Sequence, residues 1–258
     1  MSLRVSLLLP LLLCAPAAWA DEASDAAAMS SPWSGSLGEL GFASTHGNSS
    51  TESFNGHLKL LYGDGDWVHS MDLFGLRSSA EYKETNDDGS IQRQRQTTAN
   101  RYTGSAGSAL QLGEHRQLTA TVRYESDDFA TYDRQASFGL GYGTRLIDGE
   151  RLVLDTQIGP GVRRSHNIDT DESRTGLIGR GLFDLKFAIT DNTELVNTLL
   201  VESGSYNTFA QNDFGVSVAM NSHFALKAGW QARYNSDVAE DMRKTDTLAT
   251  MNVVYNFK

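Results

Sequence analysis

Residues 224–234, FALKAGWQARY, place an apolar side chain at every even-numbered position, whereas the odd-numbered positions include a lysine, a glutamine and an arginine. Successive side chains of a β-strand point to opposite faces, so this alternation predicts a strand with one apolar and one polar face. Aromatic residues, Phe224 and Tyr234, stand at both ends of the stretch. Such a strand suits a sheet with an apolar environment on one side and a polar environment on the other.

The same period of two recurs along the chain from Trp33 onward, and no segment shows a convincing apolar stripe of helical period. We therefore expect an almost all-β chain of about twelve strands. The expected spans are 33–46, 51–62, 67–82, 91–112, 117–125, 132–147, 151–164, 173–189, 194–203, 209–220, 223–234 and 245–257.

The expected connections alternate between short and long. Short turns rich in Gly, Asn and Asp lie at 63–66, 113–116, 148–150, 190–193 and 221–222. Longer polar loops lie at 83–90, 125–133, 165–172, 203–208 and 235–243, and the first loop on that side, at 47–50, is short. This layout with an even strand count predicts an antiparallel up-and-down outer-membrane barrel with both termini on the periplasmic side.

The polar faces carry long charged side chains, which a soluble sheet would expose to water as a solvated face. A barrel in lipid instead encloses them, because a bilayer supplies no water for open sheet edges or for charges. Aromatic residues at strand ends favour the lipid barrel, since such residues form girdles at both membrane interfaces. These are Tyr62, Trp67, Phe187, Phe224, Tyr255 and Phe257 at the short-turn ends, and Tyr82, Tyr124, Tyr132 and Tyr234 at the long-loop ends.

The N-terminus has the three parts of a secretory signal peptide: Arg4, an apolar stretch at 5–13, and small residues at Ala18 and Ala20. The apolar stretch is short for a membrane anchor, and Leu13 before Cys14 disfavours lipidation of that cysteine. We expect residues 1–20 to be a cleaved signal peptide, 21–32 a flexible periplasmic arm, and 33–258 the barrel.

Composition and motifs argue against several classes of protein. Lys and Arg total 22 against 32 Asp and Glu, a net charge of −10, which disfavours nucleic-acid binding. The single cysteine excludes an internal disulfide framework. The six histidines show no metal-binding spacing, and neither a G-x-S-x-G elbow nor a phosphate-binding glycine loop is present. We therefore expect no catalytic residues, no metal and no cofactor.

Several short motifs resemble a known family. They are LGELGF at 37–42, GNS at 47–49, LGYGTRL at 140–146, GPGVR at 159–163 and the C-terminal YNFK. Together they resemble the salt-induced outer-membrane proteins of Gram-negative bacteria, the domain-of-unknown-function 481 family, over nearly all of 33–258. The resemblance implies an outer-membrane barrel and no established activity.

Two hypotheses for function follow. The first is a passive barrel, a narrow channel for small polar solutes or a structural, stress-related protein, in which inner charges either line a pore or pair and plug it. Its candidate pore-lining residues are Arg123, Arg145, Arg180, Asp184, Lys227 and Arg233. The alternative is a lipase- or protease-like rim enzyme. Its candidate residues are Asp87, Asp88, Asp127, Asp128, His166 and Asp169.

The expected partners are those of an outer-membrane barrel. They are membrane lipids, lipopolysaccharide, and the barrel-assembly machinery that reads the C-terminal strand ending in Phe257 and Lys258. The acidic loops at 87–88, 127–128 and 169–172 could bridge divalent cations to lipopolysaccharide phosphates, although they lack a fixed calcium-loop spacing.

Signal cleavage after Ala20 is directly testable. Intact-mass measurement of protein extracted from membranes should give a chain that begins at Asp21. A mass that still includes residues 1–20 would contradict the expected cleavage.

Overall fold

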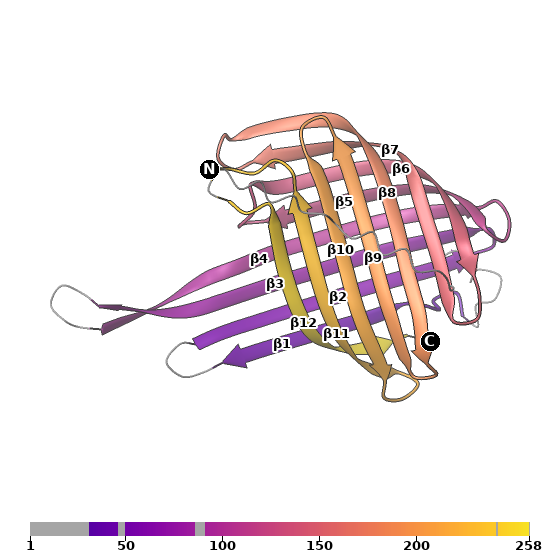
Figure 1. Ribbon diagram of the computed structural model, residues 1–258, viewed down its shortest axis with the longest axis horizontal. Helices are drawn as coiled ribbons and strands as arrows, with labels where there is room; N and C mark the ends of the chain where they lie inside the picture. Colours follow the sequence, from indigo (N-terminus) through magenta and orange to yellow (C-terminus); the bar gives the residue numbers. More distant parts are fainter. Residues whose placement is uncertain (1–30, 46–49, 86–90, 241, 258) are drawn as a thin grey trace, which may run out of the picture.

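The computed structural model describes residues 31–45, 50–85, 91–240 and 242–257. Twelve strands close into one antiparallel barrel (Figure 1). They are β1 (Leu37–Thr45), β2 (Ser50–Asp64), β3 (Trp67–Thr85), β4 (Ile91–Gln111), β5 (Arg116–Asp127), β6 (Tyr132–Asp148), β7 (Leu152–Asn167), β8 (Glu172–Thr190), β9 (Thr193–Gly204), β10 (Thr208–Ala219), β11 (Phe224–Asn235) and β12 (Thr245–Asn256). In these residues no helix combines the length and apolar character needed to cross a bilayer.

Each strand pairs with its neighbours in sequence, and the ring closes where β1 pairs with β12, from Leu37 opposite Asn256 to Gly41 opposite Asn252. Closure gives every strand a partner on both sides, which is the condition for a sheet to span lipid. The predicted all-β, up-and-down transmembrane barrel of about twelve strands is confirmed.

The strands cross the barrel obliquely, so those of one wall run at a steep angle to those of the opposite wall (Figure 1). The β3–β4 hairpin, whose strands have 19 and 21 residues, extends past the neighbouring β2 and β5, which have 15 and 12 (Figure 1). The β2–β3, β4–β5, β6–β7, β8–β9 and β10–β11 turns lie at the other end, where the C-terminal strand also finishes. Three of the expected long loops shorten to residues 128–131, 168–171 and 205–207, because the flanking strands extend into them.

The outer wall is apolar. Leu177 of β8 and Met251 of β12 are 77% and 70% exposed, an arrangement suited to contact with lipid rather than water. Aromatic rings gather at the short-turn end, where the Tyr255 ring lies 5.2 Å from both the Phe224 and Phe257 rings. In β11 the even-numbered residues face outward, whereas Lys227 and Arg233 face inward and contact other inner residues, as the alternation predicts.

The interior differs in one respect from the expected polar face. Buried apolar side chains occupy the inward-facing positions nearest the short-turn end. They are Leu61, Val68, Val153, Ala225 and Val254. These small and aliphatic residues form an apolar base, and further apolar residues, Leu76, Leu200 and Phe209, are buried higher on the inner face among the polar ones.

Among the strand boundaries that differ from the sequence prediction, two change the interior of the barrel. The first strand begins at Leu37 rather than at residue 33, because Gly35 adopts a positive φ of 83° and Ser36 turns inward to bond Leu61. Strand β5 continues to Asp127, two residues beyond the expected strand end at residue 125. The predicted signal peptide and most of the predicted arm, residues 1–30, lie outside the described residues.

The face assignment predicts which substitutions block insertion. Val122→Arg places a guanidinium on the lipid side of β5, which should cost about 2–4 kcal/mol near the bilayer midplane. Thr121→Arg, on the inner face of the same strand, should fold with a smaller loss. Folding yield into lipid vesicles measures both, and equal losses would contradict the assignment.

Candidate functional site: the charged interior

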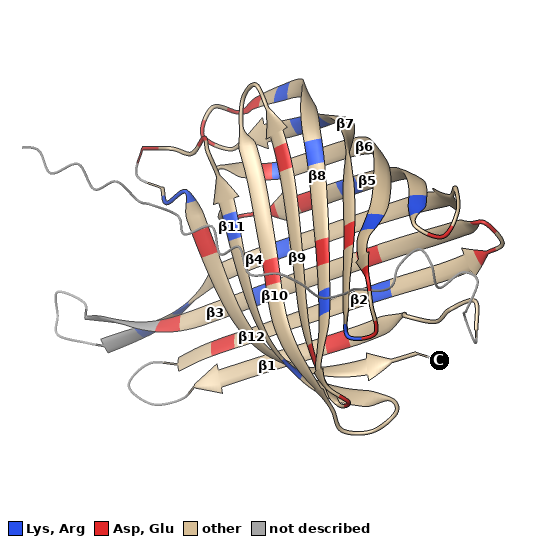
Figure 2. Ribbon diagram, turned by 45° about the vertical axis from the view of Figure 1, so that its right-hand side comes forward, with Lys and Arg blue, Asp and Glu red and all other residues tan. Residues whose placement is uncertain are grey.

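The six predicted pore-lining residues all lie on the inner wall. Charged positions recur along the middles of the strands as well as in the loops (Figure 2). Arg123 lies on β5, Arg145 on β6, Arg180 and Asp184 on β8, and Lys227 and Arg233 on β11. Each is held by other inner residues, and the partners come from near and distant strands.

Arg233 bridges the lumen. Its Nη1 donates to Asp127 Oδ2 at 2.8 Å, and its Nη2 donates to Glu125 Oε1. Strands β11 and β5 are six places apart in a ring of twelve, so these groups start from opposite walls. Arg233 is 3% exposed and Glu125 is 1% exposed, so the bridge excludes water from its own atoms.

Neighbouring groups strengthen the bridge. Arg123 Nη2 donates to Glu125 Oε2 at 2.5 Å, and Arg101 of β4 donates to Gln231 of β11. The Phe209 ring, 1% exposed, lies 5.0 Å from the Arg123 guanidinium carbon and 5.4 Å from that of Arg233. Cation–π contacts of this kind gain strength where both groups are desolvated.

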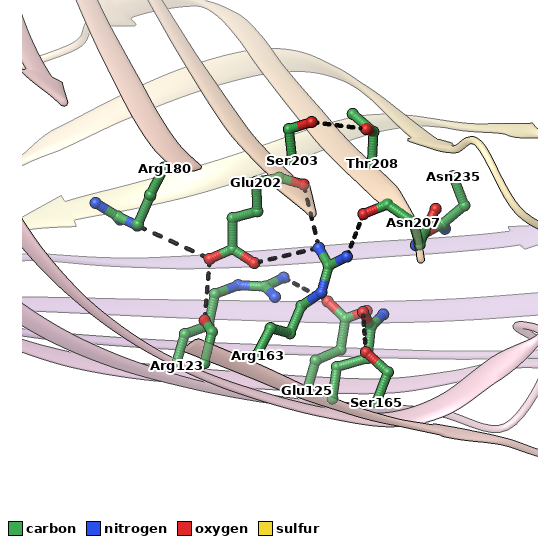
Figure 3. Close-up of polar contacts among 12 residues, drawn as sticks. Arg123, Glu125, Arg163, Ser165, Arg180, Glu202, Ser203, Asn207, Thr208 and Asn235 are labelled. Carbon is green, nitrogen blue, oxygen red and sulfur yellow. Dashed lines mark hydrogen bonds and ion pairs between the residues drawn. The ribbon is translucent and has the colours of Figure 1, made fainter. Parts of the chain in front are cut away.

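A second cluster surrounds Glu202 of β9, which is 0% exposed (Figure 3). Ser137 Oγ donates to Glu202 Oε1 at 2.9 Å, and Arg163 and Arg180 approach the carboxylate to 3.7 and 3.8 Å. Arg163 also donates to the carbonyl oxygens of Glu202 and Asn207, at 3.2 and 2.5 Å. The cluster ties β6, β7 and β8 to β9 and to the loop that follows it.

Lys227 belongs to a third cluster near the seam of the barrel. Its Nζ donates to Glu39 Oε1 of β1 at 2.5 Å, and Asn252 of β12 donates to the other Glu39 oxygen at 2.9 Å. His57 of β2 lies between two carboxylates, 2.7 Å from Asp72 and 3.5 Å from Glu39. These contacts cross the β1–β12 junction and so reinforce the closure of the sheet.

Arg145 and Asp184 pair with adjacent strands. Arg145 makes a two-pronged contact with Asp155 of β7, at 3.1 and 3.2 Å. Thr198 of β9 donates to Asp184 at 2.9 Å. These contacts therefore run between adjacent strands along the wall, unlike the Arg233 bridge across the lumen.

The long-loop end is also crossed. The Tyr132 hydroxyl, at the start of β6, donates to Asp237 in the β11–β12 loop at 2.6 Å. This contact and the Arg233 bridge both lie near the long-loop ends of their strands, so the lumen is crossed twice toward that end.

The predicted rim-enzyme residues that the structure describes, Asp127, Asp128, His166 and Asp169, do not form one site. Asp127 is an inner-face residue of β5 bound by Arg233, which corrects its expected place in a loop. Asp128 accepts from Asn100 at 2.5 Å. Asp87 and Asp88 lie outside the described residues. Among the residues that are described, no three His, Cys, Asp or Glu side chains are grouped in a way that could hold a metal ion.

Among the predicted rim-enzyme residues, His166 lies within hydrogen-bonding distance of two carboxylates. Its Nδ1 lies 2.5 Å from Asp133 and its Nε2 lies 3.1 Å from Asp171, whereas Asp169 is not among its partners. The described part of the chain supplies no Ser, Thr or Cys side chain in hydrogen bond with His166, the contact that would activate a hydroxyl or thiol nucleophile.

Sequence reasoning missed Glu125, Arg101 and Glu39 as members of the interior network. Glu125 stands at the end of the expected strand 117–125 and shares the parity of Arg123, so the alternation itself points it inward. The pairing of Arg233 with β5 has no such signal, because it depends on how the barrel closes.

The fold and its charged interior define a closed, twelve-stranded antiparallel barrel of the outer-membrane type. The chain belongs to the family described as "Protein of unknown function, DUF481", whose model matches residues 38–257. The family resemblance is thus confirmed, whereas the salt-induced label stays a prediction.

The chain is similar to uncharacterized protein YdiY of Escherichia coli (strain K12), with 23% identity over 233 residues, covering 90% of this chain and 86% of YdiY. Among solved structures it is similar to the NanC porin, with a TM-score of 0.51, 11% identity, and coverage of 86% of this chain and 99% of NanC. The translocator domain of the autotransporter NalP from Neisseria meningitidis gives a TM-score of 0.48 at 11% identity, with coverage of 86% and 87%.

The buried cluster predicts a large effect at Glu202. Glu202→Gln leaves Arg163 and Arg180 without their counter-charge, which should cost about 3–5 kcal/mol in free energy of unfolding. Glu172→Gln, which removes an exposed partner of Arg174, should cost about 0–1 kcal/mol. Urea unfolding from lipid vesicles measures both, and similar values for the two variants would contradict a buried network.

Proposed function

We propose that the protein is a passive barrel of the Gram-negative outer membrane, with a structural role and a lumen closed at rest. The observation that carries this proposal is the bridge from Arg233 to Glu125 and Asp127, which joins opposite walls with almost no exposed surface. A hydrated solute could pass only where these groups separate. The buried apolar base supplies a second closure at the other end.

The orientation follows the usual layout of such barrels, with short turns and both termini in the periplasm and long loops outside. In this orientation the Arg233 bridge lies toward the outer surface and the apolar base toward the periplasm. The last strand ends in Tyr255 and Phe257, apolar residues of the kind that assembly machinery recognises in barrel proteins. Lipids and lipopolysaccharide are then its surroundings.

A narrow channel is the second candidate. It is favoured by the six inner charged residues and by the fold shared with a protein named as a porin. Conduction would require Arg233 to leave Glu125 and Asp127, so the bridge would act as a gate. A role in envelope or salt stress is compatible with either candidate, and a rim enzyme is disfavoured by the isolation of His166 from a nucleophile among the described residues.

Planar-bilayer recording separates the two candidates. The wild-type barrel should insert without steady current, and the double variant Glu125→Ala/Arg233→Ala should also stay silent because the apolar base remains. The double variant is preferred because removing one partner alone strands a buried charge. Arg116→Ala, at an exposed position of β5, is the control for insertion.

Two results would contradict the proposal that the barrel is structural and closed. Stable ohmic current in the wild type would show an open pore. Current that appears only in the double variant would favour the gated channel, with selectivity expected to change on replacement of Lys227 or Arg180.

A further inference from the structure

The outer wall of the barrel is hollowed by a groove of about 580 Å³ that extends across strands β3 to β7. Small residues form its floor: Gly104 and Ala106 of β4 and Ala136 of β6. Larger apolar residues, Leu73 and Phe138 among them, stand beside them with 39% and 46% of their surfaces exposed. The groove therefore lies on the lipid-facing side, outside the charged interior.

The strand register gives the groove a direction. Leu73 pairs with Gly104, Gly104 with Tyr124, Tyr124 with Ala136, and Ala136 with Arg164. This row crosses four inter-strand spacings, roughly 19 Å. An elongated apolar chain would fit along such a row, with the Arg164 guanidinium at one end.

Arg164 is the unusual member of the row. It is exposed on the outer face of β7, where Val162 is the preceding outward-facing residue. The strand ends three residues later, at Asn167. No described residue forms an ion pair or hydrogen bond with its side chain. An arginine on the lipid face is costly at the midplane and tolerated at the interface, where an anionic group can pair with it.

We infer that this groove binds lipid A, the phosphorylated and acylated anchor of lipopolysaccharide, with an acyl chain along the floor and a phosphate on Arg164. The inference rests on the proposed outer-membrane orientation, which places Arg164 at the outer leaflet. The acyl chain would gain close van der Waals packing against the small-residue floor, as small residues allow for other partners within a membrane, and a guanidinium–phosphate pair adds charge-assisted hydrogen bonds. A small-residue floor with an unpaired cation at its end matches both halves of that ligand.

Native mass spectrometry of the barrel refolded in detergent and titrated with purified lipid A tests the inference. The wild type should bind one lipid A with preference over phosphatidylglycerol and over dephosphorylated lipid A. Arg164→Gln should weaken binding about tenfold, the loss of roughly 1.5 kcal/mol expected for a hydrogen bond to a charged group. Ala136→Leu should weaken it by filling the floor.

The matched controls are Arg116→Gln and Ala228→Leu, which make the same changes at exposed positions of β5 and β11 away from the groove. Both should bind lipid A as the wild type does. Unchanged binding in Arg164→Gln and Ala136→Leu, equal losses in the controls, or equal binding of the two comparison lipids would overturn the inference. Bilayer current does not depend on these outer-wall positions, so failure here is distinct from failure of the proposed function.

Discussion

The rest of the structure depends on the burial of the Arg233–Glu125 pair between opposite walls of the barrel. Charges of this kind are costly to remove from water, and their mutual attraction compensates only when the geometry is good and further hydrogen bonds are supplied. Here Arg123 donates to Glu125, and the Phe209 ring lies beside the guanidinium groups of Arg123 and Arg233. Most of the buried charges are paired with one another, although Arg233 Nε and Glu202 Oε2 are buried without a hydrogen-bond partner. Pairing of this kind lets protein groups take the place of water in the middle of the barrel.

The outer and inner faces of each strand meet different environments and therefore carry different side chains. The outer face meets hydrocarbon, so its side chains are apolar and its backbone groups are paired around the closed ring. The inner face must fill a lumen of intermediate width, and the long arms of Arg163, Arg180 and Arg233 span distances that aliphatic residues would not. Near the short turns the apolar side chains of Leu61 and Val254 are buried on the inner face instead. The Glu39–Lys227 contact then secures the seam between first and last strands.

Much of the fold was predictable from the sequence, because alternation is a local property and the lipid makes it strong. All twelve strands lie within a few residues of their expected spans, and the two marked differences arise at Gly35 and Asp127. The inward direction of Arg123 and Arg233 was likewise local. Their meeting with Glu125 was not predictable, since it depends on strand number, tilt and closure together. Likewise, the groove beside Arg164 results from residues of five strands brought into one row.

The central claim is that Arg233 and Glu125 are energetically coupled across the lumen. A double-mutant cycle with Glu125→Gln, Arg233→Met and both together, measured as free energy of unfolding from vesicles, tests it most directly. The account predicts a coupling energy of about 2–3 kcal/mol, typical of residues in one buried network. Free energies that add within about 0.5 kcal/mol, as they do for distant sites, would contradict it.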